Sequence, residues 1–211
     1  MRAILLVVLV SCSMGLFAQS KEEVALNNLA VSLMDNGNYT EALAHLDKLT
    51  ASDRDNFVYR YNRAVTLFNL KKYSEAIAEY KYLHELLPEQ AEYIFQIGNA
   101  YEQMDSLKLA VDFYSKAIEM DQDHFIYFFK RGTVLLKQDE FLKAATDFTS
   151  SISLNPKHHN SFHNRGIAAF KLGQQDKACE DWCEARRLGN TYSGHHFNQN
   201  CSQSPACIVV K

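Results

Sequence analysis

Small and large residues recur along this chain at intervals of 34 residues, between Glu23 and Tyr192. The eighth position of each interval is always small, and the twenty-fourth position is always large. In chain order the small residues are Ala30, Ala64, Gly98, Gly132 and Gly166, and the large ones are Leu46, Tyr80, Tyr114, Phe148 and Trp182. A small residue that faces a bulky one lets two helices cross closely. Because Pro88 and Pro156 both fall at position 32, where a helix must stop, the pattern predicts two helices in each interval.

The recurring pattern divides most of the chain into five contiguous blocks. They cover residues 23–56, 57–90, 91–124, 125–158 and 159–192. This pattern resembles the tetratricopeptide repeat, a helix-turn-helix unit of 34 residues. The resemblance implies an all-α fold, a right-handed solenoid of five helix-turn-helix repeats that bury one another's apolar faces. The two ends depart from the pattern, because the first block has no proline at position 32 and the fifth has Gly189 and Asn190 where its second helix should end.

An apolar leader precedes the blocks. Residues 1–18 carry one arginine, at position 2, followed by apolar stretches that end at Ala18, and a polar run follows at once. Such a segment is typical of a secretory signal peptide, and it is shorter than the ~20 residues that span a membrane. We therefore expect cleavage after Ala18 and an exported protein in the periplasm or associated with the cell envelope. Alternatively, Leu9-Val10-Ser11-Cys12 resembles a lipobox, in which case Cys12 would carry a lipid anchor.

Charge and motif content argue against several classes of function. The chain has a formal net charge of −3, and loss of the leader removes one more positive charge. No cluster of lysine and arginine is dense enough to follow a phosphate backbone, so nucleic acid is not an expected partner. A glycine-rich phosphate loop, a G-x-S-x-G elbow and an H-E-x-x-H pair are all missing from the sequence. We therefore expect no catalytic residues and no cofactor.

Four cysteines lie close to the C-terminus: Cys179, Cys183, Cys201 and Cys207. The last two belong to a polar tail, residues 193–211, which lacks helical periodicity from Gly194 onwards. In an exported protein an even, clustered set of cysteines favours disulfides, and the tail is expected to fold back over the apolar face that a terminal repeat leaves open. Three pairings are possible. We prefer Cys183 with Cys201 and Cys179 with Cys207, because a bond between the two helix cysteines would strain the helix.

A metal site is the alternative for the same cysteines, with His195 or His196 as further ligands. Only the gap between Cys179 and Cys183 has a spacing that zinc sites favour, and an exported compartment oxidises thiols. No metal is therefore expected. Metal binding in the tail is the one route by which this chain would be an enzyme.

By resemblance, the first helix of each repeat lines a concave groove. The candidate contact residues in this groove are Asn27, Tyr61, Asn62, Phe68, Phe95, Gln96, Asn99, Phe129, Lys130, Lys137, His163, Asn164 and Lys171. Aromatic rings bury apolar area while amides satisfy backbone groups, so such a groove suits an extended peptide or a partner helix. About half of these residues are expected to be true surface, since rings such as Phe129 can instead pack within the solenoid.

Arginine recurs at the seventh position of three blocks, as Arg63, Arg131 and Arg165. We expect these residues to form internal ion pairs with nearby acidic side chains. Together these features predict a non-catalytic scaffold or adaptor of the bacterial cell envelope, which binds a protein or peptide. The alternative is an outer-membrane lipoprotein with a structural or assembly role, anchored through Cys12.

Overall fold

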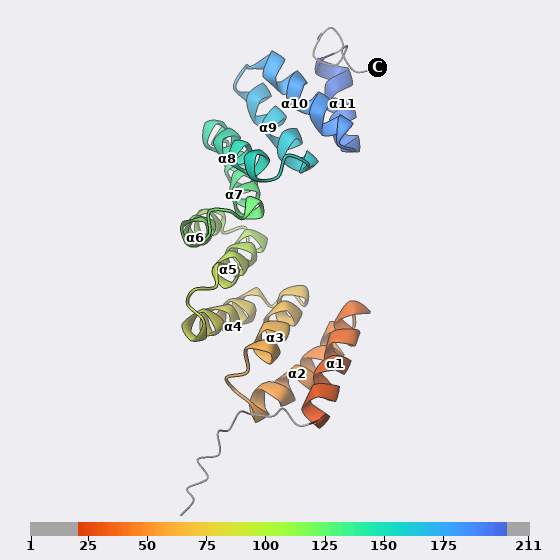
Figure 1. Cartoon of the computed structure of the whole chain (residues 1–211), viewed down its shortest axis with the longest axis vertical. Coiled ribbons are helices and arrows are strands. Elements are labelled where there is room, and N and C mark those ends of the chain that lie inside the picture. Colours follow the sequence, from red (N-terminus) through yellow and green to blue (C-terminus); the bar gives the residue numbers. More distant parts are fainter. Residues whose placement is uncertain (1–20, 202–211) are drawn as a thin grey trace, which may run out of the picture.

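The computed structural model describes residues 21–201, which form eleven α-helices joined by short turns (Figure 1). The helices are α1 (Lys21–Asp35), α2 (Tyr39–Ser52), α3 (Phe57–Asn69), α4 (Tyr73–Leu86), α5 (Ala91–Gln103), α6 (Leu107–Met120), α7 (Phe125–Lys137), α8 (Phe141–Leu154), α9 (His159–Lys171), α10 (Gln175–Arg187) and α11 (Thr191–Asn200). Consecutive helices pack as pairs, and each pair stacks on the next. The described range contains no strand, so the predicted all-α solenoid is confirmed.

Helices and turns follow the 34-residue register. The first helices of the second to fifth blocks, α3, α5, α7 and α9, begin at position 1 of their block. The turn inside each pair holds a residue with positive φ at position 15, and these residues are Gly37, Lys71, Asp105, Asp139 and Gly173. The N–H of the next residue then reaches back to a carbonyl of the preceding helix, as from Lys72 to Leu67 at 2.9 Å. The chain therefore reverses direction in the same way in every repeat.

The small and large residues of the repeat meet where the two helices of a pair cross, and all of them are buried. A Cβ added to Gly166 would lie 2.6 Å from Nε1 of Trp182, and one added to Gly98 would lie 2.7 Å from Cδ1 of Tyr114. Such distances leave no room for a methyl group beside a buried ring. The close helix crossing predicted from the sequence is confirmed, and glycine is what permits it in the last three repeats.

The arginines at the seventh position form internal ion pairs, as the sequence predicts. The pairs are Arg63 with Glu79, Arg131 with Asp147 and Arg165 with Asp181. Arg131 donates to both oxygens of Asp147, at 2.7 and 2.8 Å, a bidentate geometry that makes such pairs strong. In the third block the same two positions hold Ile97 and Phe113, so apolar residues replace the ion pair there.

The chain beyond the fifth repeat forms a helix that the sequence does not predict. Helix α11 covers residues 191–200, so the expectation that the tail lacks a helix from Gly194 onwards is wrong. The side chain of Asn190 caps this helix by accepting a hydrogen bond from the backbone N–H of Ser193, at 2.9 Å. Phe197 packs against the apolar cluster around Trp182. Capping and tertiary packing thus stabilise a short helix whose own periodicity is weak.

The predicted disulfide pairing is also wrong. Cys179 of α10 bonds to Cys201, which directly follows α11, with their Cα atoms 5.6 Å apart. Cys183, the predicted partner of Cys201, is disulfide-bonded as well. Cys207, the predicted partner of Cys179, lies outside the described residues.

The position of α11 explains the observed pairing. Helix α11 packs on α10 as the first helix of a further repeat would, but it begins two residues earlier than the 34-residue period requires. Counted from Thr191, Cys201 is at position 11, and Cys179 is at position 21 of the fifth block. At the earlier junctions these two positions hold apolar pairs, Leu43 and Leu67, Ile77 and Tyr101, Val111 and Leu135, and Ala145 and Ala169. The disulfide therefore takes the place of an apolar pair between neighbouring repeats.

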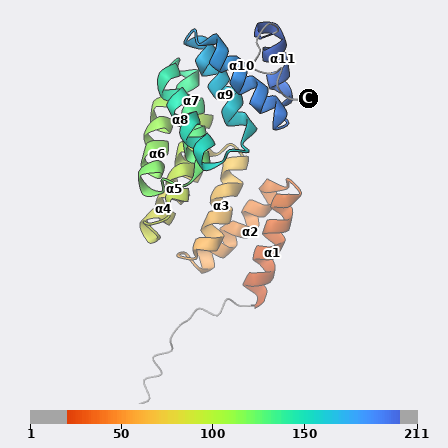
Figure 2. The same ribbon diagram turned by 45° about the horizontal axis from the view of Figure 1, so that its top comes forward.

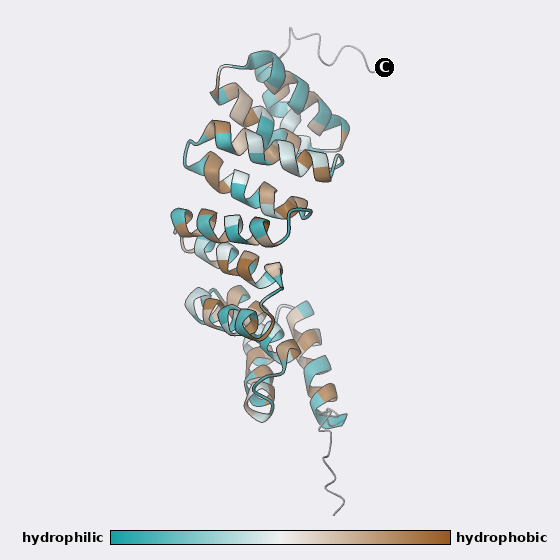
Figure 3. Cartoon of the chain, turned by 60° about the vertical axis from the view of Figure 1, so that its left-hand side comes forward, coloured by the Kyte–Doolittle hydropathy of each residue, from teal (hydrophilic) through white to brown (hydrophobic). Residues whose placement is uncertain are grey.

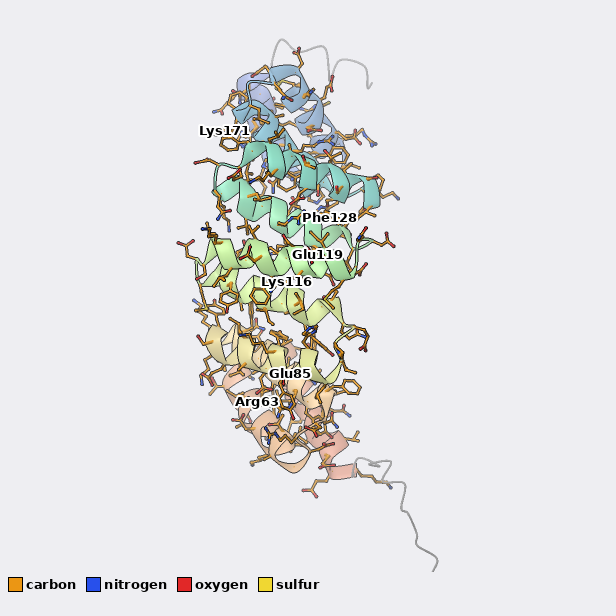
Figure 4. All side chains as sticks on the ribbon, turned by 90° about the vertical axis from the view of Figure 1, so that its left-hand side faces the viewer. Arg63, Glu85, Lys116, Glu119, Phe128 and Lys171 are labelled. Atoms are coloured by element: carbon orange, nitrogen blue, oxygen red, sulfur yellow. A yellow bond between two sulfur atoms is a disulfide. The ribbon has the colours of Figure 1, made fainter. Side chains whose placement is uncertain are left out.

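The stack is elongated and curved. Helices α1 and α11 lie on the same side of the middle repeats, so this side is concave (Figures 1 and 2). Figure 4 looks onto the opposite, convex side, where Glu85 of α4 and Lys116 and Glu119 of α6 are seen. Hydrophilic and hydrophobic residues alternate along the helices in Figure 3. Within residues 21–201 no helix combines the length and the apolar character needed to cross a membrane.

Candidate functional site

Polar side chains join successive first helices of the repeats. Nδ2 of Asn62 in α3 donates to Oδ1 of Asn27 in α1 at 3.0 Å. Further along, Nδ2 of Asn164 in α9 donates to Oγ1 of Thr133 in α7 at 3.4 Å. These bonds connect residues about one repeat apart, so three of the predicted groove amides link α1 to α3 and α7 to α9.

A pocket of about 300 Å³ opens between α3 and the start of α5, and we call it the α3–α5 pocket. Its lining residues are Phe57, Val58, Tyr61, Asn62, Gln90, Glu92 and Tyr93. Phe57 is 53% exposed, whereas Tyr93 is buried. Two predicted residues, Tyr61 and Asn62, therefore line a cavity, and the other five were not in the predicted set. Val58 and Glu92 share position 2 of their repeats, which is the sequence signal that could have found them.

Phe95 does not contribute to the groove surface. Its side chain is only 6% exposed, and its ring lies 5.5 Å from that of Tyr114 and 4.7 Å from that of Tyr127. Tyr61, at the same position of the preceding repeat, remains partly exposed, and its two tyrosine neighbours lie farther away, both at 6.2 Å. We therefore assign Phe95 to the core instead of the contact surface.

The two amides that follow Phe95 belong to a chain of hydrogen bonds along α5. Gln96 donates to Glu92 at 2.6 Å, and Asn99 donates to Gln96 at 3.0 Å. The hydroxyl oxygen of Tyr114 lies 2.8 Å from Oδ1 of Asn99. These contacts fix the amide orientations, and because an amide nitrogen carries two donors, each side chain can still serve a ligand.

Glu102 is a buried carboxylate held by two of the predicted groove lysines. Oε1 accepts a hydrogen bond from Lys137 at 2.7 Å, and Oε2 accepts one from Lys130 at 3.2 Å and one from Tyr114 at 2.9 Å. Burial alone would raise the pKa of Glu102, but the hydrogen bond from Lys137 and the charge of Lys130 outweigh it, so this pKa is lowered. Both lysines of α7 therefore join it to Glu102 of α5.

Helix α11 packs on α10 and contacts His163 of α9 at the C-terminal end of the stack. Nδ1 of His163 is hydrogen-bonded to the hydroxyl of Ser193 at 2.7 Å, and the two rings of His163 and His196 are 5.3 Å apart. Burial, together with the charges of His196 and His159, lowers the pKa of His163 to about 4. His163 is thus a docking contact for α11, whereas Lys171, seen near this end in Figure 4, is exposed.

The remaining predicted aromatic residues are partly exposed and packed against neighbours. The ring of Phe68 lies 5.4 Å from that of Tyr73 in an edge-on arrangement. The ring of Phe129 lies 4.6 Å from that of His158, also edge-on, and 6.0 Å from that of Phe148. Both residues support the wall of the solenoid while part of each ring faces solvent.

Two surface pockets between second helices were not predicted. One, of about 520 Å³, is lined by Leu142, Ala145 and Ala169 among others, and Leu142 is 68% exposed. The other, of about 380 Å³, lies beside the ion pair of Arg131 and Asp147. Small side chains at positions 11 and 21 leave the larger space open, and alanine at both positions of one junction is a signal that the sequence does contain.

The described range does not support the metal alternative. No group of three or more His, Cys, Asp or Glu side chains between residues 21 and 201 is arranged to hold a metal ion. The sulfur atoms of Cys179 and Cys201 bond to each other and so are not free thiolates, the form in which cysteine binds metals.

The paired helices and the uniform turns define an α-solenoid of helix-turn-helix repeats. Sequence models of the tetratricopeptide repeat match residues 27–91 and residues 91–124. No curated protein matches the chain.

Solved structures share the fold. YrrB, described as a TPR protein with an unusual peptide-binding site, has a TM-score of 0.66 at 20% identity, covering 85% of this chain and 94% of YrrB. A MamA crystal structure has a TM-score of 0.69 at 20% identity, covering 82% and 94%. MamA from Desulfovibrio magneticus RS-1 has a TM-score of 0.72 at 16% identity, covering 81% and 97%. This chain is a tetratricopeptide repeat protein, and that fold implies a scaffold for protein-protein interaction.

Proposed function

We propose that this protein is a non-catalytic adaptor of the bacterial cell envelope that holds an extended peptide or a partner helix in its concave groove. The α3–α5 pocket carries the proposal, because it combines the exposed apolar side chains of Phe57 and Val58 with the amide of Asn62. Apolar anchors seated in a pocket beside backbone-binding amides are what a peptide site requires. The fold similarity to YrrB, described as having a peptide-binding site, supports the proposal.

Two features support a location in the envelope. The leader, residues 1–18, is typical of a secretory signal peptide. The Cys179–Cys201 disulfide suits an oxidising compartment, since cytosolic reductants keep thiols reduced. The mass of the intact protein from cells tests the form of export. A chain that starts at Gln19 supports a soluble protein, and a lipid-modified Cys12 at the N-terminus supports the anchored alternative.

Capture of the partner tests the groove. The mature chain, residues 19–211, would be used to capture proteins from envelope extracts, alongside a Phe57→Ser/Tyr61→Ala variant. Leu142→Ser is the matched control, because Leu142 is more exposed than Phe57 but lies between second helices. Circular dichroism of each variant verifies that the helices remain folded. A protein lost only with the groove variant supports the proposal, whereas a protein lost only with Leu142→Ser refutes binding through the groove.

A further inference from the structure

The α3–α5 pocket has aromatic walls. Phe57, Tyr61 and Tyr93 all line it, and the ring centroids of Tyr61 and Tyr93 are 6.2 Å apart with their planes inclined by 50°. Because these two rings are not stacked, they do not cover each other's faces, which carry negative partial charge. Burial and the charge of Glu92 raise the pKa of Tyr61, so its ring stays an uncharged phenol at neutral pH.

Glu92 adds a carboxylate to the same pocket. It lies in the first turn of α5, where the helix dipole favours negative charge. It accepts hydrogen bonds from Gln96 at 2.6 Å and from Tyr127 at 3.5 Å. Among residues 21–201 no lysine, arginine or histidine forms an ion pair with Glu92. Glu102, on the same helix, differs in this respect because two lysines neutralise it.

We propose that the α3–α5 pocket binds the cationic side chain of a lysine or arginine in the partner. This inference rests on the proposed function and names the chemistry that the groove selects. An ammonium or guanidinium group beside Glu92 would lie against the aromatic faces, which attract cations. The apolar stem of the same side chain would contact Phe57 and Val58 at the mouth, and the carbonyl oxygens of Asn62 and Gln90 would accept its remaining N–H donors.

The same geometry selects against an uncharged apolar side chain. A leucine or norleucine in the pocket would fill the space beside Tyr61 and Tyr93 but would remove water from the Glu92 carboxylate without replacing its hydrogen bonds. Burial of a charge without a partner is unfavourable. The pocket therefore distinguishes a basic side chain from an apolar one of equal length.

Small-molecule probes test this chemistry without knowledge of the partner. The mature chain, residues 19–211, would be titrated with Nα-acetyl-lysine N-methylamide, with the arginine equivalent and with the norleucine equivalent, and followed by NMR of the tyrosine rings and the Asn62 amide. We expect saturable shifts with the lysine and arginine probes, and binding of the norleucine probe that is weaker by about fivefold or more. Glu92→Gln should weaken the lysine probe by about tenfold.

Two further variants keep the test decisive. Glu119→Gln is the matched control, since it removes an exposed carboxylate seen on the convex side in Figure 4, and it should leave probe affinity unchanged. Tyr61→Leu removes one ring and should weaken the lysine probe by roughly threefold to tenfold. Equal binding of the lysine and norleucine probes overturns the inference, as does lysine binding that survives both Glu92→Gln and Tyr61→Leu in folded protein. Lysine selectivity without any captured envelope protein supports the pocket and overturns the proposed function instead.

Discussion

The bond between Cys179 and Cys201 is expected to hold the C-terminal cap in place, and replacing both residues with alanine tests this. Both sulfur atoms are buried, so the change removes a covalent bond without exposing a polar group. Alanine is a suitable replacement because Ala145 and Ala169 occupy the same two positions at the preceding junction. The Cys179→Ala/Cys201→Ala variant therefore reproduces packing that the chain already uses.

The size of the effect follows from the loop that the bond closes. Its ends are separated by 22 residues in sequence, and the loop-closure entropy for that length stabilises the closed state by about 3 kcal/mol. Each repeat of a solenoid contacts only its neighbours, so the loss should fall on α11 and the adjoining face of α10. A loss of about 3 kcal/mol corresponds to roughly 150-fold more frequent opening of α11.

Hydrogen exchange measured by mass spectrometry reports this opening helix by helix. We expect α11 to exchange roughly 100-fold faster in the alanine variant, with α3 to α8 unchanged. A Cys179→Val/Cys201→Leu variant copies Val111 and Leu135 from an earlier junction, and it should recover about 1 kcal/mol or more of the lost stability through apolar burial. Unchanged protection of α11 in the alanine variant would refute the reasoning, and so would an equal loss of protection in every helix.

Two other predictions concern groups within the repeats. Asp147→Ala leaves the guanidinium of Arg131 without its bidentate partner, so it should lower the free energy of unfolding, measured in urea, by about 3 kcal/mol. The double variant Arg131→Ile/Asp147→Phe copies Ile97 and Phe113 of the third block and should lower it by less than about 1 kcal/mol. A double variant as unstable as the single one would contradict this. His163 has a folded-state pKa of about 4 against an ordinary value of 6.5, so the unfolded state binds more protons between these pH values. Stability should therefore be complete above pH 6.5 and fall as the pH drops towards 4, and thermal unfolding of His163→Gln should show a smaller loss.

The features that repeat are the ones that the sequence predicts well. The small and large positions, the number of helix pairs and the internal ion pairs of Arg63, Arg131 and Arg165 all recur with the same spacing, so each repeat supports the assignment of the others. The turns are as uniform as the helices, but this is less visible in the sequence. Position 15 has positive φ in every repeat, although only Gly37 and Gly173 carry the residue that favours it.

The features that depend on a single junction are the ones that sequence reasoning gets wrong. Helix α10 and the turn that follows it are each one residue shorter than their counterparts, and this shift of two residues brings Cys201, instead of Cys207, opposite Cys179. The exposure of a predicted groove side chain likewise depends on the packing within its own repeat. Position 5 holds an aromatic ring at both Tyr61 and Phe95, and each ring packs against two tyrosines. Only Phe95 is buried, because its two tyrosines lie closer, at 5.5 and 4.7 Å against 6.2 Å for both neighbours of Tyr61. A repeat register specifies which way a side chain points but not what covers it.

Because a disulfide holds only one end of the solenoid within residues 21–201, unfolding is expected to start at the other end. In a linear array a terminal unit has one neighbour instead of two, so melting begins at an end and passes inward. The bond between Cys179 and Cys201 ties α11 to α10, while within the described residues α1 is held by non-covalent contacts, with Leu29 47% exposed. On heating or under mechanical force, the helices should therefore unfold in order from α1 towards α11. The α3–α5 pocket, nearer the weaker end, would lose its shape before the repeats next to the disulfide, so a bound ligand there would strengthen the end that opens first.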